Sequence, residues 1–222
     1  MKQIAIILAG GIGNRMNAGI PKQFMLLGDK PVLMHTINRF HEANSSMEIL
    51  VVLPENEIKA WEALCQKHSF RIVHKIVDGG ETRFHSVKNG LVYMDEKSIV
   101  AIHDGARPFA SATLINKTFS EAEKFGNAVP AISVNESLRK VVGDKNEIAD
   151  RSSFVIIQTP QCFQSETLKS AYKSDFKNSF TDDANVVEFV GESIHLIDGE
   201  RDNNKITFPA DLIIGEAFLK SR

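Results

Sequence analysis

The chain has 222 residues, of which 43% are hydrophobic and 24% are charged, a composition typical of one globular domain over residues 1–222. A formal net charge of −2 excludes the broad basic surface that duplex nucleic acid binding usually requires. No apolar run is long enough to cross a membrane, so neither nucleic acid nor a membrane is an expected partner.

The cysteine and histidine contents narrow the class of protein further. Cys65 and Cys162 are the only cysteines and form no CxxC pair, so a disulfide framework is not indicated and a reducing, cytoplasmic location is expected. The seven histidines show no HxxxH or HExxH spacing, which gives no ground for a histidine metal site.

Apolar runs of strand length alternate with segments of helical periodicity. The runs are Ile4 to Leu8, Ile49 to Leu53, Ile72 to Val77, Ile99 to Ile102 and Ala128 to Val134. The helical stripes are Leu33, Ile37 and Phe40, then Ile58, Trp61, Leu64 and Cys65, then Phe84, Val87, Leu91 and Met94. This alternation predicts an α/β fold with a mainly parallel sheet and helices on both faces. Ligands of such sheets bind at the carboxyl ends of the strands.

The glycine loop in LAGGIGNRMNAGIPKQ directly follows the first predicted strand. Gly10, Gly11 and Gly13 lack the Cβ atoms that would keep a phosphate away from the backbone amides. Arg15 and Lys22 add fixed positive charge, which a tight turn alone would not require. The loop therefore predicts a site for nucleotide phosphates.

Two better-known phosphate motifs do not match this loop. A P-loop requires GxxxxGK followed by Ser or Thr, and no such string occurs. The dinucleotide fingerprint stops at Gly13, because Met16 replaces the third glycine and no acidic residue ends the run Ile49 to Leu53. An ATPase or GTPase is not indicated, while an NAD-dependent oxidoreductase and a simple strand-to-helix turn remain minor alternatives.

The segment DGGETR follows the third predicted strand and would reach the same sheet edge. Gly79 and Gly80 allow close approach of the backbone to a ligand. Arg83 and Ser86 either contact a base and ribose or only begin a helix, and the sequence does not separate these two interpretations.

The segment HDGARP follows the fourth predicted strand. Asp104 and Arg107 could form only a turn pair at the surface. Alternatively, Arg107 grips a second phosphate or a sugar while Asp104 holds hydroxyl groups or Mg²⁺. Their position at the end of a strand favours a role in binding.

Residues 135–151, NESLRKVVGDKNEIADR, have few large apolar side chains and a GDKN turn between two short extended runs. They predict a projecting β-hairpin, called the arm below. Because an isolated hairpin is only marginally stable in water, we expect the arm to embrace a second subunit. A mobile surface hairpin without a partner is the alternative.

Polar groups also end several later predicted elements: Arg151, Thr159 and Gln161, the TDD triplet at 181–183, and Lys205. Separately they carry little information. The TDD triplet is also a good helix N-cap, although Thr181 can serve both purposes.

Seven segments, LAGGIGNRM, PKQ, DGGETR, HDGARP, TPQ, TDD and DNNKIT, occur in this order over nearly the whole chain. Together they resemble the 2-C-methyl-D-erythritol 4-phosphate cytidylyltransferase family. The glycine loop with PK is common to sugar nucleotidyltransferases in general. HDGARP together with Lys205 narrows the resemblance to this cytidylyltransferase family and its pentitol-phosphate relatives. The small residues Gly105 and Ala106 are similar to the methylerythritol branch, since ribitol 5-phosphate cytidylyltransferases tend to carry bulkier residues there.

The resemblance implies a Rossmann-like α/β fold, a homodimer built through the arm, CTP as co-substrate with Mg²⁺, and a place in non-mevalonate isoprenoid synthesis. It implies four catalytic residues: Arg15 and Lys22 at the α-phosphate, and Arg151 and Lys205 at the incoming phosphate. It implies a CTP site formed by Ala9, Gly10, Gly11, Gly80, Glu81, Arg83, Ser86 and Ala106. The acceptor pocket would comprise Asp104, Arg107, Ser137, Thr159 and Thr181, partly across the dimer, and no metal ligands are assigned.

Two positions depart from the family pattern. Ser137 replaces the usual threonine of the arm, and Glu81 replaces a common aspartate, so the hydroxyl and the carboxylate are kept but their reach changes. We expect these two replacements to alter the affinity for substrates more readily than the activity. The alternatives to this resemblance are a ribitol 5-phosphate cytidylyltransferase and a non-catalytic nucleotide-binding module.

Overall fold

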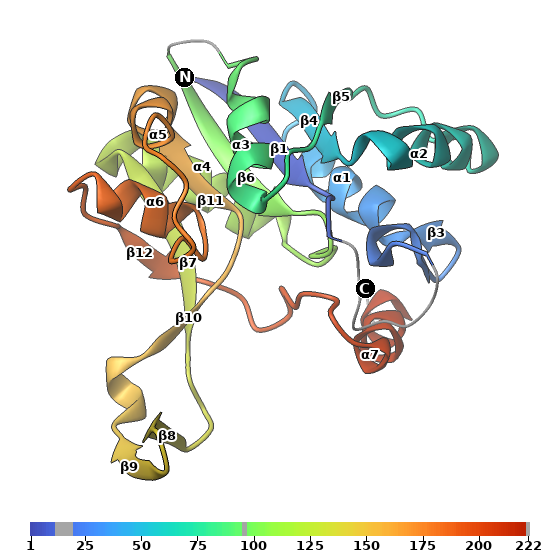
Figure 1. Cartoon of the computed structure of the whole chain (residues 1–222). Helices are drawn as coiled ribbons and strands as arrows, with labels where there is room; N and C mark the ends of the chain where they lie inside the picture. Colours follow the sequence, from blue (N-terminus) through green and yellow to red (C-terminus); the bar gives the residue numbers. More distant parts are fainter. Residues whose placement is uncertain (12–19, 95–96, 221–222) are drawn as a thin grey trace.

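The computed structural model describes residues 1–11, 20–94 and 97–220. Its centre is an eight-stranded sheet in the order β10-β7-β11-β6-β1-β4-β5, with β12 paired to β7 beside this path. The strands are β1 (Lys2–Leu8), β4 (Glu48–Leu53), β5 (Lys75–Asp78), β6 (Ser98–Asp104), β7 (Asn127–Ser133), β10 (Val155–Ile157), β11 (Gln161–Gln164) and β12 (Leu196–Asp198). Helices cover both faces of the sheet (Figure 1), as the sequence predicts.

The strands β6, β1, β4 and β5 are parallel and end together at one edge. Leu8 at the end of β1 is in register with Val52 of β4 and with Asp104 of β6. Strand β11 runs antiparallel between β6 and β7, and β10 is antiparallel to β7, so the sheet is mixed on this side. The predicted third strand begins later than expected, because only Lys75–Asp78 pair with β4.

Alternate residues of β1 enter two separate cores, because side chains of a strand point to opposite faces. Ala5 and Ile7 pack with one group of helices, and Ile4 and Ile6 pack with the other. The first group is α1 (Val32–Ala43), α2 (Glu55–Lys67) and α4 (Ala112–Phe125). The second group is α3 (Arg83–Leu91), α5 (Ser165–Ala171) and α6 (Asp183–Phe189). The three helical stripes predicted from the sequence lie on α1, α2 and α3, although Met94 lies beyond the end of α3.

The predicted hairpin is present and projects away from the body of the molecule (Figure 1). It consists of the antiparallel strands β8 (Leu138–Val142) and β9 (Lys145–Ala149), followed by the 3-10 helix η3 (Arg151–Ser153). Gly143 turns the hairpin with a φ of +59°, a conformation that favours glycine.

The C-terminal helix α7 (Pro209–Lys220) closes a third, small core. This core contains Leu27 of β2 (Leu26–Leu27), Val32 after β3 (Lys30–Pro31), Phe109 and Ile206. Gly215 lets α7 approach closely, since a Cβ there would lie 2.9 Å from Leu27 Cδ1. Among the described residues, no helix combines the length and the apolar composition needed to cross a membrane.

Candidate functional site

A cavity of about 340 Å³ opens where β1, β4, β5 and β6 end. This is the sheet edge at which the sequence predicts a ligand. The cavity is lined by eleven of the predicted site residues: Ala9, Gly10, Gly11, Lys22, Gly80, Glu81, Arg83, Ser86, Asp104, Ala106 and Lys205.

The segment after β1 forms one wall of this cavity. The Ala9 amide donates to Val52 O at 2.9 Å, which extends the pairing of β1 with β4 past the end of the strand. Lys22 begins the 3-10 helix η2 (Lys22–Phe24), and its Cε would lie 3.7 Å from a Cβ placed on Gly11. The lysine side chain therefore lies over the glycine segment. Arg15 and Gly13 lie outside the described residues.

Gln23 is a site residue for which the sequence analysis predicts no role. Its Nε2 donates to Ala9 O at 2.5 Å, and the residue is 2% exposed. This bond holds the PKQ segment against the end of β1. Its only signal in the sequence was its place in the PKQ segment, directly after Lys22.

The DGGETR segment forms the opposite wall and also begins a helix. The predicted helix start is confirmed, whereas the contact of Arg83 and Ser86 with a base and ribose stays a prediction. The Gly79 amide donates to Leu53 O at 2.7 Å, and the Gly80 amide donates to Ser86 Oγ at 3.1 Å. Thr82 caps α3, because its Oγ1 accepts from the His85 amide at 3.4 Å. Arg83 and Ser86 follow this cap and still line the cavity.

We expect Gly80→Ala to lower the free energy of unfolding by about 1–3 kcal/mol, the usual cost of forcing extra volume into a packed site. A Cβ at Gly80 would lie 2.4 Å from His85 Cβ and 2.9 Å from His85 C, so the loop must move away from α3. Urea unfolding measures this change. Gly10→Ala is the matched control, since its Cβ would meet nothing nearer than 3.9 Å; equal stability of the two variants would contradict this reading.

Asp104 is the anionic centre of the cavity. Its Oδ2 lies 2.9 Å from Lys205 Nζ and 3.3 Å from Arg107 Nε. Burial raises the pKa of Asp104, but the charges of Lys205, Arg83 and Arg107 outweigh burial and hold that pKa well below its ordinary value. The carboxylate is therefore ionised and able to orient Lys205.

Arg107 forms the predicted turn pair with Asp104, but the pair is partly buried rather than fully at the surface. Both side chains are 13% exposed. Arg107 Nη1 also donates to Asn203 O at 2.8 Å. Arg107 is absent from the described lining of the cavity. Its side chain links the HDGARP loop to the backbone at Asn203, and its predicted contact with a second phosphate or a sugar stays a prediction.

A hydrogen-bonded chain beneath the same loop uses the hydroxyl of Thr159. That oxygen accepts from the Asp104 amide at 3.1 Å and lies 3.1 Å from His103 Nδ1. Burial lowers the pKa of His103 to about 4, so the ring is neutral; its Nε2 donates to Arg107 O at 3.1 Å, and its Nδ1 accepts from Thr159. Thr159 is thus buried with its hydroxyl engaged by the loop, and its predicted place in the acceptor pocket stays a prediction.

We expect His103 to make folding pH-dependent. Because the free imidazole titrates near 6.5 and the buried one near 4, the unfolded chain binds a proton first, and stability falls as the pH falls through this window. The loss amounts to about 3 kcal/mol when complete.

Urea unfolding between pH 7 and pH 4 measures this effect by comparison with variants. His103→Asn should flatten the dependence on pH, whereas His41→Asn, at an exposed position of α1, should leave it unchanged. An identical slope in His103→Asn would contradict the prediction.

Three other predicted site residues lie away from the cavity in this single chain. Ser137 and Arg151 are exposed on the arm, and the Arg151 guanidinium donates to Asn135 O, which joins the two ends of the arm. Thr181 is exposed immediately before α6. Asp182, and not Thr181, caps this helix, because its Oδ1 accepts from the Asn185 amide at 2.9 Å.

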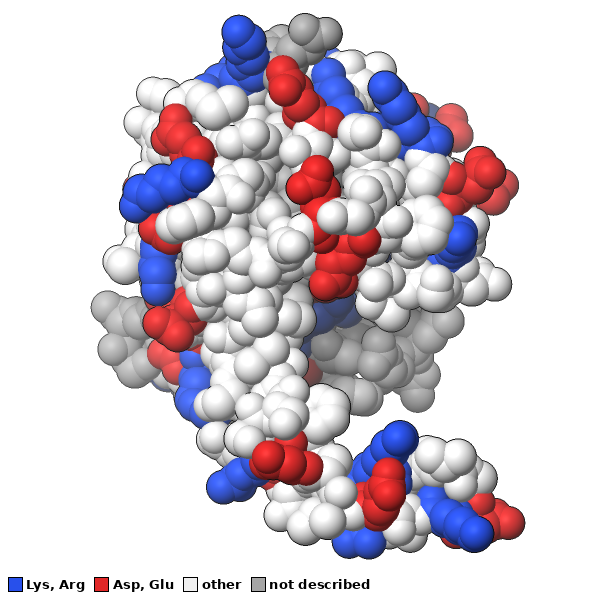
Figure 2. All heavy atoms as spheres, turned by 90° about the vertical axis from the view of Figure 1, so that its left-hand side faces the viewer, with Lys and Arg blue, Asp and Glu red and all other residues white. Residues whose placement is uncertain are grey.

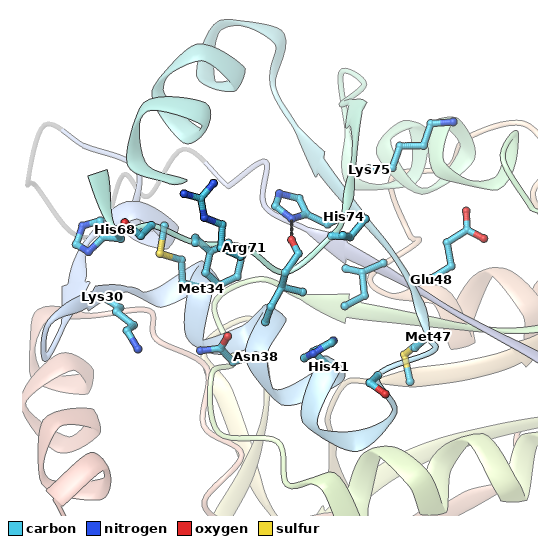
Figure 3. A pocket seen from close by; sticks show the side chains of 16 residues that line it. Lys30, Met34, Asn38, His41, Met47, Glu48, His68, Arg71, His74 and Lys75 are labelled. Carbon is cyan, nitrogen blue, oxygen red and sulfur yellow. Dashed lines mark hydrogen bonds between the residues drawn. The ribbon is translucent and has the colours of Figure 1, made fainter. Parts of the chain in front are cut away.

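A second cavity, of about 780 Å³, lies between α1 and the segment 68–75 (Figure 3). Its described lining contains none of the predicted site residues. His74 in this lining has a structural role: its Nε2 accepts from Trp61 Nε1 at 3.0 Å, so its Nδ1 carries the proton and donates to Ile72 O at 2.8 Å. The larger cavity therefore lacks the glycines and the aspartate–lysine pair of the smaller one.

The family model of IspD, 2-C-methyl-D-erythritol 4-phosphate cytidylyltransferase, matches residues 3–221. The chain belongs to this family. The 2-C-methyl-D-erythritol 4-phosphate cytidylyltransferase of Bacteroides thetaiotaomicron is 46% identical over 219 residues, which are 99% of this chain and 100% of the relative. That of Geobacillus kaustophilus is 38% identical over 225 residues, covering 100% of this chain and 99% of the relative.

Solved structures of the cytidylyltransferase family share the fold. The 4-diphosphocytidyl-2C-methyl-D-erythritol synthase of Anaerococcus prevotii has a TM-score of 0.82 at 30% identity and covers 99% of both chains. The cytidylyltransferase of Thermus thermophilus has a TM-score of 0.81 at 29% identity, over 99% of this chain and 100% of that chain. The resemblance, the Rossmann-like α/β fold and the nucleotidyltransferase class are confirmed, and the matches support this family over its ribitol 5-phosphate relatives.

Proposed function

We propose that this chain transfers the cytidylyl group of CTP to 2-C-methyl-D-erythritol 4-phosphate, giving 4-diphosphocytidyl-2-C-methyl-D-erythritol and pyrophosphate. The observation that carries the proposal is the cavity in which the glycine segment, Lys22 and the Asp104–Lys205 pair meet. Family membership supplies the substrate class.

The proposed reaction is a direct transfer. A phosphate oxygen of the acceptor attacks the α-phosphorus of CTP, and the bond from that phosphorus to the bridging oxygen of the β-phosphate breaks. Arg15 and Lys22 stabilise the charge that develops at the α-phosphate, and Lys205 positions the incoming phosphate. The ion pair with Asp104 orients Lys205 for this task.

The DGGETR wall is proposed to bind the nucleoside, with Ala9, Gly10, Gly11 and Ala106 completing the CTP site. Ser86 accepts from the Gly80 amide, so its own hydroxyl proton remains available for a ligand acceptor. Glu81 lies between Gly80 and Ser86 in the chain and lines the same cavity. Carbonyl and carboxylate oxygens here suit the amino group of cytosine.

The arm is proposed to join two chains and to carry Ser137 and Arg151 to the acceptor pocket of the partner subunit. Thr181 remains a candidate for the same pocket. The arm exposes Val141, Val142 and Ile148, and β10 exposes Val155 and Ile156, which are apolar groups suited to burial in a dimer. Figure 2 shows that residues other than Lys, Arg, Asp and Glu cover much of the face above the arm, although acidic residues also lie near its centre.

Mixing two inactive variants tests the arm. Arg151→Ala and Lys22→Ala subunits should together regain activity, because one site of the mixed dimer receives an intact Lys22 and an intact Arg151. No recovery in dimers that form and exchange subunits would place Arg151 in its own chain's site.

Mg²⁺ is proposed to act with CTP. Among the described residues, no group of three or more His, Cys, Asp or Glu side chains is placed to hold a metal ion. This fits a cation that is bound mostly by substrate phosphates and by one or two carboxylates, for which Asp104 and Glu81 line the cavity. The cation would neutralise charge on the departing pyrophosphate. Chelation should abolish activity, and added Mg²⁺ should restore it.

Pyrophosphate release from Mg²⁺ and CTP tests the function, with methylerythritol 4-phosphate compared against ribitol 5-phosphate. We expect release with the methylerythritol acceptor. Preference for ribitol phosphate would favour that relative, and tight CTP binding without release would indicate a binding module. Labelled CMP retained on denatured protein would contradict direct transfer.

A further inference from the structure

A buried carboxylate lies behind the nucleotide cavity and binds one of its lining residues. Arg83 Nη1 donates to Asp183 Oδ1 at 2.8 Å, and Nη2 donates to Oδ2 at 2.6 Å. Asp183 is 0% exposed, whereas the Arg83 side chain is 32% exposed. The aspartate end of the pair is therefore shielded from solvent, whereas the arginine end is accessible at the cavity.

The Asp183 carboxylate is itself fixed by its surroundings. The Tyr172 hydroxyl donates to its Oδ1 at 2.6 Å, and the tyrosine ring stacks on Phe84 with centroids 4.7 Å apart. Gln161 holds the start of α6, because its Oε1 accepts from the Ala184 amide at 2.9 Å. Asp183 is thus bonded directly to Arg83 of α3 and to Tyr172, which adjoins α5. Gln161 of β11 fixes the neighbouring residue, Ala184.

This geometry determines what Arg83 can offer to a ligand. A guanidinium has five N–H groups in a fixed plane, and Asp183 uses one on each Nη. Asp183 leaves the other three unused: the second N–H of each Nη and the N–H of Nε. Burial lowers the pKa of Arg83, but the Asp183 carboxylate raises it more, so the group stays protonated. Its charge is largely balanced by Asp183, which leaves Arg83 as a directional donor.

We propose that Asp183, supported by Tyr172, is a positioning residue for the nucleotide: it holds the Arg83 guanidinium so that the remaining N–H groups meet neutral oxygen acceptors of the nucleoside. This inference rests on the proposed function of the cavity as the CTP site. A buried ion pair contributes little net stability compared with apolar packing, so its main effect here is on the orientation of Arg83.

Asp183→Asn tests the proposal because the amide has the same shape but opposes one Arg83 nitrogen with a donor. We expect the KM for CTP to rise about tenfold and kcat to change by less than about threefold, since a contact to a non-reacting part of the substrate is lost. The KM for the acceptor should stay unchanged. Glu188→Gln is the matched control, because it makes the same carboxylate-to-amide change at an exposed position of the same helix.

A double-mutant cycle separates positioning from a general structural role. If Asp183 acts through Arg83, then Asp183→Asn adds nothing to the KM for CTP in an Arg83→Gln background. An equal rise in both backgrounds, or a wild-type KM in Asp183→Asn alone, would overturn the proposal. Wild-type protein that fails to turn over CTP would instead refute the proposed function.

Tyr172→Phe gives a second route to the same answer if Asp183→Asn fails to fold. The ring keeps its stacking on Phe84, and only the hydrogen bond to Asp183 is removed. We expect the KM for CTP to rise by about twofold to threefold, in line with the modest net contribution of one hydrogen bond. An unchanged KM in this variant would count against the proposal.

Discussion

Lys22→Ala is expected to lower kcat by about two to three orders of magnitude while the fold stays intact, as the loss of a preorganised group at a charged transition state usually does. Lys22 lies over the glycine segment, with its Cε 3.7 Å from the position of a Cβ on Gly11. Because Gln23 anchors the same short helix to Ala9, the alanine variant should keep the backbone in place.

Steady-state pyrophosphate release and circular dichroism together measure this effect. Lys30→Ala is the matched control, since Lys30 lies in the nearby strand β3 and lines the other cavity. Lys22→Arg should recover part of the rate, because charge is retained while geometry changes. Near-normal turnover in Lys22→Ala would remove the lysine from the proposed chemistry.

The central strands could be predicted from the sequence because each is a continuous apolar run, buried on both faces. Strands β10, β11 and β12 could not, since they have only three or four residues and depend on pairing with distant segments. Strand β11 begins with Gln161, a polar residue that is 1% exposed. Its burial is possible only because its side chain bonds to Asp182 and to the Ala184 amide, partners that no local pattern reveals.

The same reasoning explains the site. Glycine-rich segments that follow strands reach one sheet edge by topology, so their convergence is predictable. Arg83 and Asp183 are 100 positions apart, and the sequence alone gives no means to pair them. Thr159 lies at the predicted edge, but its hydroxyl turns inward to the Asp104 amide. Packing decides whether a short side chain at the end of a strand points into the protein or toward the ligand.

Lys205→Ala is expected to lower kcat/KM for the methylerythritol acceptor by about a hundredfold or more, because a positioned cation opposite a phosphate is lost. CTP affinity should change much less, since the glycine segment and the DGGETR wall remain. Asp104 should keep Arg107, which lies 3.3 Å away, so the partly buried carboxylate is not left without a cation. The loop should therefore stay folded.

The two substrates separate this role of Lys205 from a general loss of the site. Titration of CTP by calorimetry and kinetics with varied acceptor give the two affinities independently. Lys117→Ala is the control, because Lys117 pairs with an aspartate, Asp198, at an exposed position outside the cavity. If CTP affinity falls as far as acceptor efficiency, Lys205 binds the nucleotide and the assignment of the incoming phosphate is wrong. If only kcat/KM for the acceptor falls, the Asp104–Lys205 pair marks the side from which the acceptor attacks.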